Sequence, residues 1–167
     1  LSKVDIKLPR IRPKGVKNIH AYLTNEARHI DIGLKSVDLA SLYRLEQKLN
    51  VYILSDYNYI ILKLHAFADR ISDEKKDYGR YHVLDIFNTV LSMLEEDWKI
   101  THKHRKAAQN SEYIARCINI ISEYFSAPDK MGIIRLKENE NYKIRKNEYD
   151  KHIDVFISDI KKLFEID

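Results

Sequence analysis

The sequence has a single cysteine, four glycines and three prolines among its 167 residues. The lone cysteine, Cys117, excludes an intramolecular disulfide and a zinc site built from cysteines. Its neighbours Ile114, Ile118 and Ile121 indicate that it fills the core. Because the sequence carries no disulfide framework, we expect a cytoplasmic protein.

Long apolar runs are also missing. A membrane span needs roughly 18 consecutive apolar residues, and Ser55, Asp56 and Lys63 interrupt the most apolar segments. We therefore expect no membrane partner. The chain begins at Leu1 rather than at methionine, and we expect it to be a piece of a longer protein that continues upstream.

Charge of one sign is not in large excess. The sequence has 29 lysines and arginines against 25 aspartates and glutamates, a net charge of +4. This balance indicates a mixed surface that is compatible with phosphate-bearing partners but does not require them.

The first third of the sequence has the pattern of short strands. Apolar and polar residues alternate over 4–8, 19–23 and 30–34, which is the period of a half-buried strand. Residues 24–27 suit a hairpin turn. We therefore expect a three-stranded antiparallel patch, followed by a helix over 37–49 and a short buried strand over 51–54.

The remaining sequence has helical spacing. Ser55 is expected to cap a helix over 56–72, and a polar connector over 73–79 follows. Further helices are expected over 80–97, 107–125 and 145–164, with a strand or extended arm over 132–136 and a mobile loop over 137–147. The pattern predicts an α+β protein, with a small antiparallel sheet of about three strands packed on a mostly helical body of four to five helices. We divide it into a partial sheet subdomain, residues 1–54, and a helical domain, residues 55–167.

Two charged residues lie among apolar neighbours on adjacent predicted helices, Lys63 and Asp85. On one interpretation they are solvated, with Lys63 in a salt-bridged stripe that includes Asp56 or Asp69. On the other they line a cleft, because helices joined by a short connector are antiparallel neighbours. The connector adds Lys75, Lys76, Asp77 and Arg80 around Gly79, a basic cluster suited to phosphate oxygens.

This region resembles a known family. The segments that carry the resemblance are Ile61–Ala66 with Asp69 and Arg70, then Lys76 and Asp77, then Leu84–Phe87. They are similar to the C-terminal motif region of the abortive-infection nucleotidyltransferases, toxin-like members of the DNA polymerase beta superfamily. The resemblance implies that Lys63 contacts a nucleoside triphosphate and that Asp85 supports the active site, both as catalytic residues. Nucleotide binding would use Lys63, Arg70, Lys76, Asp77 and Arg80.

The family's metal-binding half is not visible in the sequence. The family holds magnesium with a Gly-Ser turn and an Asp-x-Asp pair, and this chain has no Gly-Ser. Asp31, in a strand-like segment, is the one candidate for a metal-binding carboxylate. We therefore expect the C-terminal portion of a nucleotidyltransferase-like protein that binds a nucleotide weakly. The intact protein would use magnesium and a nucleoside triphosphate, with RNA or a protein as acceptor and an antitoxin as partner.

Two alternatives remain open. One is a non-catalytic module that binds nucleic acid or protein, for which the basic cluster His102–Lys106 could contact a phosphate backbone or simply be a solvated loop. The other is a helical ribonuclease. Six residues separate Arg145 from His152, which resembles the Arg-x(4–6)-His motif of helical toxin ribonucleases. In that family the pair stabilises and protonates the reacting phosphate.

Overall fold

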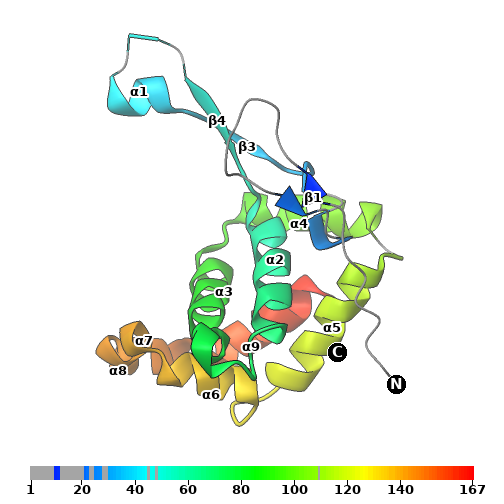
Figure 1. Ribbon diagram of the computed structural model, residues 1–167, viewed down its shortest axis with the longest axis vertical. Helices are drawn as coiled ribbons and strands as arrows, with labels where there is room; N and C mark the ends of the chain where they lie inside the picture. The colour runs from blue at the N-terminus through cyan, green and yellow to red at the C-terminus, as the bar shows by residue number, and fades with distance from the viewer. Residues whose placement is uncertain are drawn as a thin grey trace.

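The structure, a computed structural model, describes residues 10–11, 21–22, 25–27, 30–44, 46–47, 49–108 and 110–167. It is mostly helical, and two short strand pairs lie at one end of the helical body (Figure 1). The longer helices are α2 (Asp56–Ala68), α3 (Arg80–Ser92), α4 (Glu95–Ala107), α5 (Glu112–Tyr124), α6 (Met131–Glu138) and α9 (Ile153–Leu163). Short α-helices are α1 (Leu39–Tyr43), α7 (Glu140–Ile144) and α8 (Lys146–Tyr149). The 3-10 segments are η1 (Asn25–Ala27), η2 (Glu74–Gly79) and η3 (Asp150–His152).

The helical pair α2 and α3 forms the centre of the core, as the apolar spacing predicts. Ser55 caps α2, and its side-chain oxygen accepts a hydrogen bond from the Asn58 amide at 3.3 Å. The side chains that α2 and α3 bury completely are Ile60, Ile61, Leu64, Phe67, Val83, Ile86 and Phe87. Cys117 on α5 is fully buried against this core, and burial raises the pKa of its thiol. Its predicted place in the core is therefore confirmed.

The connection between α2 and α3 is a tight left-handed turn. Asp77, Tyr78 and Gly79 have φ angles of 56°, 51° and 73°. A Cβ atom at Gly79 would lie 2.9 Å from the Phe67 ring, so glycine lets the chain turn back closely against α2. The predicted polar connector is thus a compact turn that brings the two helices together in antiparallel orientation.

The strands differ from the predicted three-stranded patch. β1 (Arg10–Ile11) pairs with β2 (Ala21–Tyr22), and β3 (Lys35–Asp38) pairs separately with β4 (Asn50–Ile53). β2 falls within the predicted strand 19–23 and β4 largely matches the predicted strand 51–54, whereas residues 4–8 lie outside the described residues. Residues 30–33 form a turn rather than a strand, because Gly33 has a φ of 73°.

The predicted helix over 37–49 is wrong in most of its length. Asp38 caps the five-residue helix α1, and Arg44 ends it with a φ of 54°. β3 and β4 pair antiparallel, with Val37 opposite Val51. The residues between these strands, α1 included, therefore form the connection of a hairpin. The hairpin projects away from the helical body (Figure 1). Cross-strand pairing therefore overrides the local helical spacing.

Three further predictions about the C-terminal half need correction. The helix over 80–97 ends at Ser92, because Met93 and Leu94 are extended and Asp97 accepts a hydrogen bond from the Leu94 amide at 2.8 Å. The predicted strand over 132–136 is helix α6, and Gly132 lets it pack against α5. The predicted loop over 137–147 is instead mostly helical, because it contains the end of α6, all of α7 and the start of α8. The predicted helix over 145–164 is confirmed over most of its length, although it is divided into α8, η3 and α9. Buried Tyr142 and Tyr149 hold these short segments to the core.

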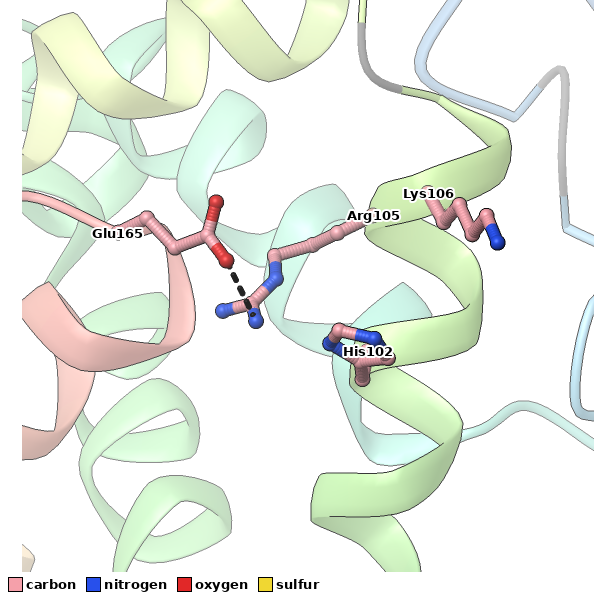
Figure 2. A pocket seen from close by; sticks show the side chains of 4 residues that line it. All are labelled: His102, Arg105, Lys106 and Glu165. Atoms are coloured by element: carbon pink, nitrogen blue, oxygen red, sulfur yellow. Dashed lines mark ion pairs between the residues drawn. The ribbon is translucent and has the colours of Figure 1, made fainter.

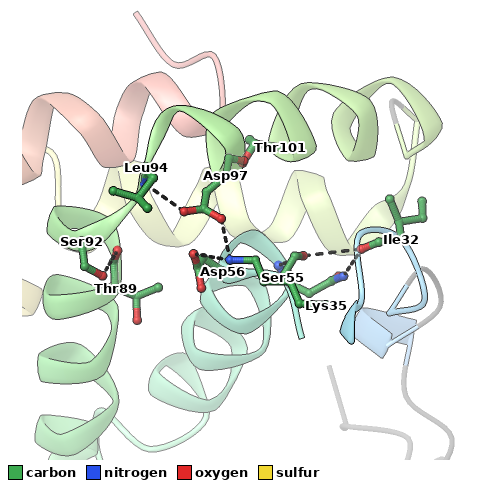
Figure 3. Close-up of polar contacts among 10 residues, drawn as sticks. Ile32, Lys35, Ser55, Asp56, Thr89, Ser92, Leu94, Asp97 and Thr101 are labelled. Atoms are coloured by element: carbon green, nitrogen blue, oxygen red, sulfur yellow. Dashed lines mark hydrogen bonds and ion pairs between the residues drawn. The ribbon is translucent and has the colours of Figure 1, made fainter. Parts of the chain in front are cut away.

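A charged contact attaches the hairpin to the helices (Figure 3). Lys35 on β3 donates from Nζ to Asp97 of α4 at 2.6 Å and to Asp56 of α2 at 3.4 Å. The hydrogen bond to Asp97 raises the pKa of Lys35. Burial and the nearby Asp97 charge raise the pKa of Asp56. The base of the hairpin is also held where Asn58 donates to the Ile32 carbonyl at 2.9 Å.

Within the part of the chain that the structure describes, none of the helices combines the length and the apolar character that a membrane crossing requires.

Candidate functional site

The structure brings Lys63 and Asp85 into contact. Lys63 Nζ on α2 lies 2.5 Å from Asp85 Oδ2 on α3, and the Tyr59 ring lies 4.8 Å from the same nitrogen. The side chains are 23% and 38% exposed, so the pair lies at the surface edge of the helix interface. Burial lowers the pKa of Lys63, but the hydrogen bonds to Asp85 and Tyr59 outweigh it and raise the pKa overall. The predicted antiparallel contact is confirmed, and Lys63 is already neutralised by its partner.

His82 lies beside this pair. Burial lowers its pKa, and the charges of Arg70 and Lys63 lower it further. Its buried Nδ1 atom has no hydrogen-bond partner among the described residues. Arg70 itself donates to the Ala66 carbonyl at 2.9 Å. Lys63, Arg70 and His82 therefore share one surface, on which Asp85 offsets part of the positive charge.

The other predicted nucleotide-binding residues lie in the η2 connector and at the start of α3. Arg80 forms an ion pair with Asp77, and the hydrogen bond to Asp77 raises the pKa of Arg80. Lys76 lies 3.5 Å from Asp73. A phosphate group would have to compete with these carboxylates for each cation.

The described residues contain no cluster of three metal-binding side chains. Among them no group of three histidine, cysteine, aspartate or glutamate side chains lies close enough to hold a metal ion. Asp31, the predicted metal ligand, is exposed in the turn that precedes β3.

A cavity of about 420 Å³ lies where α3 ends, against the segment that joins α7 to α9. Arg145 and His152, the two residues of the ribonuclease-like motif, both line it. The other lining residues are Asn88, Val90, Leu91, Ser92, Met93, Trp98, Glu148, Tyr149, Val155 and Asp159. Arg145 and His152 are both exposed to solvent, so a ligand in the cavity can reach them.

The local fold explains why these two residues meet at one cavity. The interval between them is spanned by α8 and η3, and Arg145 is the non-helical residue that separates α7 from α8. His152 then precedes α9 with a φ of −107° and a ψ of 1°. The two breaks place both side chains at the ends of a short helical segment, next to the cavity.

The Arg145 guanidinium is held in a defined orientation. It donates to both Glu148 carboxylate oxygens, at 2.8 and 3.1 Å, and to the Tyr149 hydroxyl at 3.0 Å. The hydrogen bond to Glu148 raises the pKa of Arg145, which therefore stays charged. Tyr149 in turn packs against Phe87, with ring centroids 5.2 Å apart. The core thus supports the residue that orients Arg145.

A second cavity, of about 210 Å³, lies near the C-terminal end of α4. His102, Arg105, Lys106 and Glu165 line it (Figure 2). Arg105 donates to the carbonyls of Lys162 and Leu163 at 3.0 and 3.1 Å and pairs with Glu165 at 2.8 Å. The basic cluster of residues 102–106 is therefore part of a helix and not an interhelix loop.

Comparisons with family models, with curated proteins and with solved structures return no match for this chain.

Sequence reasoning missed several residues of the larger cavity. Glu148 and Tyr149 follow Arg145 at three and four residues, the spacing of side chains that meet on a helix. That spacing could have identified them as partners of Arg145. Trp98 is the one tryptophan of the sequence, but the break at Met93 and Leu94 that positions it has no clear signal in the sequence.

Proposed function

We propose that the protein cleaves RNA at the cavity lined by Arg145 and His152. The observation that supports this function is that the two residues of the Arg-x(4–6)-His spacing line the same solvent-accessible cavity of about 420 Å³. The mostly helical fold is consistent with the helical ribonucleases that the motif resembles.

The chemistry follows from the two side chains. The ribose 2′-hydroxyl loses its proton to solvent and attacks the phosphorus, so that an O2′–P bond forms while the P–O5′ bond breaks. His152 gives a proton to the departing 5′-oxygen as a general acid. Arg145 donates hydrogen bonds to the phosphoryl oxygens, where negative charge increases in the transition state. The products are a 2′,3′-cyclic phosphate and a 5′-hydroxyl.

The ion pair between Arg145 and Glu148 does not prevent this role. The Glu148 side chain is 56% exposed and that of Arg145 is 54% exposed. Exposed pairs contribute at most about 1 kcal/mol, so a phosphate can replace the carboxylate. Until then, Glu148 and Tyr149 hold the guanidinium at the cavity through hydrogen bonds.

A fluorophore-quencher RNA of mixed sequence tests the proposal. We expect His152→Ala to lower the cleavage rate about 100-fold or more and Arg145→Ala to lower it about 100-fold to 1,000-fold. Arg116→Ala is the matched control, because Arg116 is a similarly exposed arginine, 50% exposed, in an ion pair with Asp69 at 2.6 Å. A substrate with 2′-deoxyribose at every position should resist cleavage. Equal rates for wild type and both cavity variants would refute the proposal.

A second candidate is nucleotide binding at Lys63. The charges of Lys63 and Arg70, which both act on His82, favour it, and a phosphate would have to displace Asp85 from Lys63. Titration of ATP with magnesium against wild type and Lys63→Ala tests this function by isothermal calorimetry. Binding that is lost in Lys63→Ala supports it, and equal affinities or no binding to the wild type exclude Lys63 from a nucleotide site.

A further inference from the structure

Three lysines near the junction of α4 and α9 make no ion pair among the described residues: Lys103, Lys106 and Lys162. All three are exposed. Lys99, earlier on α4, differs because it pairs with Glu95 at 2.8 Å. Arg105 differs as well, because it holds the end of α9 through two carbonyls and Glu165. The structural role of this cluster is therefore carried by Arg105, and the three lysines are left available to a ligand.

These lysines are connected to the larger cavity by Trp98. Lys162 lies 4.9 Å from the centroid of the Trp98 ring, and Trp98 also lines the cavity with Arg145 and His152. Trp98 and Arg105 are seven residues apart on α4, about 10 Å at the rise of an α-helix. Both residues contact α9 at its C-terminal end, Trp98 through the Lys162 side chain and Arg105 through the carbonyls of Lys162 and Leu163.

The arrangement along α4 thus has three parts in order. The cavity with Arg145 and His152 lies at one end, the Trp98 ring with Lys162 lies next to it, and Lys103 and Lys106 lie beyond. Figure 2 shows Lys106 extending away from the Arg105–Glu165 pair rather than toward it. Exposed cations together with an aromatic ring are the features that bind a single-stranded nucleic acid.

We propose that Lys103, Lys106 and Lys162, with Trp98, form a binding track for the backbone of single-stranded RNA that leads into the cleavage cavity. The proposal rests on the proposed function, because it identifies the substrate as a strand several nucleotides long. Phosphates of the strand contact the lysines, and a base next to the scissile phosphate contacts the Trp98 ring. Lysines at the last turn of a helix also stabilise the helix end, so the test must separate binding from stability.

The test measures binding and not cleavage. A fluorescein-labelled single-stranded RNA is titrated with the His152→Ala protein, which keeps the strand intact, and anisotropy is recorded from 50 to 200 mM salt. The same measurement is made after adding Lys103→Glu and Lys106→Glu. We expect the dissociation constant to rise at least tenfold at low salt. Loss of two phosphate contacts should reduce the slope of log affinity against log salt by about 1.4.

The matched control carries Lys130→Glu and Lys137→Glu in the same background. These lysines also make no ion pair among the described residues, and they belong to α6 and its N-cap, at the end of the body away from α4 (Figure 1). The control makes the same change in net charge and should bind like the parent. Urea midpoints of all three proteins should agree within error, which excludes unfolding as the cause.

The outcomes separate the two proposals. A reduced slope in the Lys103/Lys106 variant alone supports the track, even where the wild-type protein fails to cleave RNA. Equal slopes and affinities for the Lys103/Lys106 variant and the control overturn the track, even where the wild type cleaves RNA. An equal loss in both double variants shows a net-charge effect and also overturns it.

Discussion

Replacing Phe87 with alanine should lower the free energy of unfolding strongly. It should also loosen the packing of Tyr149, whose hydroxyl accepts a hydrogen bond from Arg145 at the cavity. Phe87 is fully buried on α3. Its ring lies 5.2 Å from the Tyr149 and Phe156 rings and 6.0 Å from the Tyr142 ring, all near edge-to-face. Truncation of a buried phenylalanine costs about 3–5 kcal/mol, and three lost ring contacts place Phe87→Ala toward the upper end of that range.

Urea denaturation followed by circular dichroism measures the effect. With a slope of about 2 kcal/mol per molar urea, a loss of about 4 kcal/mol lowers the midpoint by about 2 M. Phe87→Leu keeps most of the volume and should cost about 1.5 kcal/mol or less. The reasoning is refuted if the alanine variant loses less than about 1.5 kcal/mol with an unchanged slope. That result would mean that neighbouring side chains close the gap.

Three further predictions concern other sites. Gly79→Ala should lower the free energy of unfolding by about 1–3 kcal/mol, because the residue has a φ of 73° and a Cβ would meet the Phe67 ring. The same urea denaturation measures this loss, and an unchanged midpoint would contradict the turn geometry. Burial lowers the pKa of His65 and of His82, so both stay neutral in the folded state while the unfolded chain takes up protons near pH 6.5. The free energy of unfolding should therefore fall as the pH is lowered below about 6.5, and fall less in His65→Gln; a midpoint equal at pH 7.5 and 5.5 would argue against it. Glu148→Gln removes the charge that competes with phosphate for Arg145, so KM for RNA should fall severalfold while kcat changes little, and a raised KM would assign Glu148 a different role.

The sequence predicts the elements whose apolar spacing is regular and locally capped. Ser55 starts α2 as expected, and the antiparallel contact of Lys63 with Asp85 follows from two helices and a short connector. The seven-residue step from Arg145 to His152 places both side chains at one cavity, although the segment between them is not a regular helix. These features follow from helical spacing, capping and short connections.

Features that depend on how one element packs or pairs with another were not predictable. Residues 37–49 have helical spacing, but pairing of Val37 with Val51 makes the segment a hairpin. Gly132 suggested an extended arm, whereas it is the small residue that lets α6 approach Tyr124 and Phe125 at the end of α5. The role of Trp98 depends on where α4 lies against α9, and single-sequence patterns carry no information on that.

The contact of Lys35 with Asp97 joins residues 62 apart in the sequence, whereas Lys63 and Asp85 are only 22 apart. Closing a longer loop costs more chain entropy, and only a short connector separates α2 from α3. Hence the central helices can assemble before the hairpin base is in place, and the hairpin can detach while the helices persist. Amides of β3 should exchange with solvent through this local opening, at a lower free energy than amides of α2, which open only when the whole core unfolds.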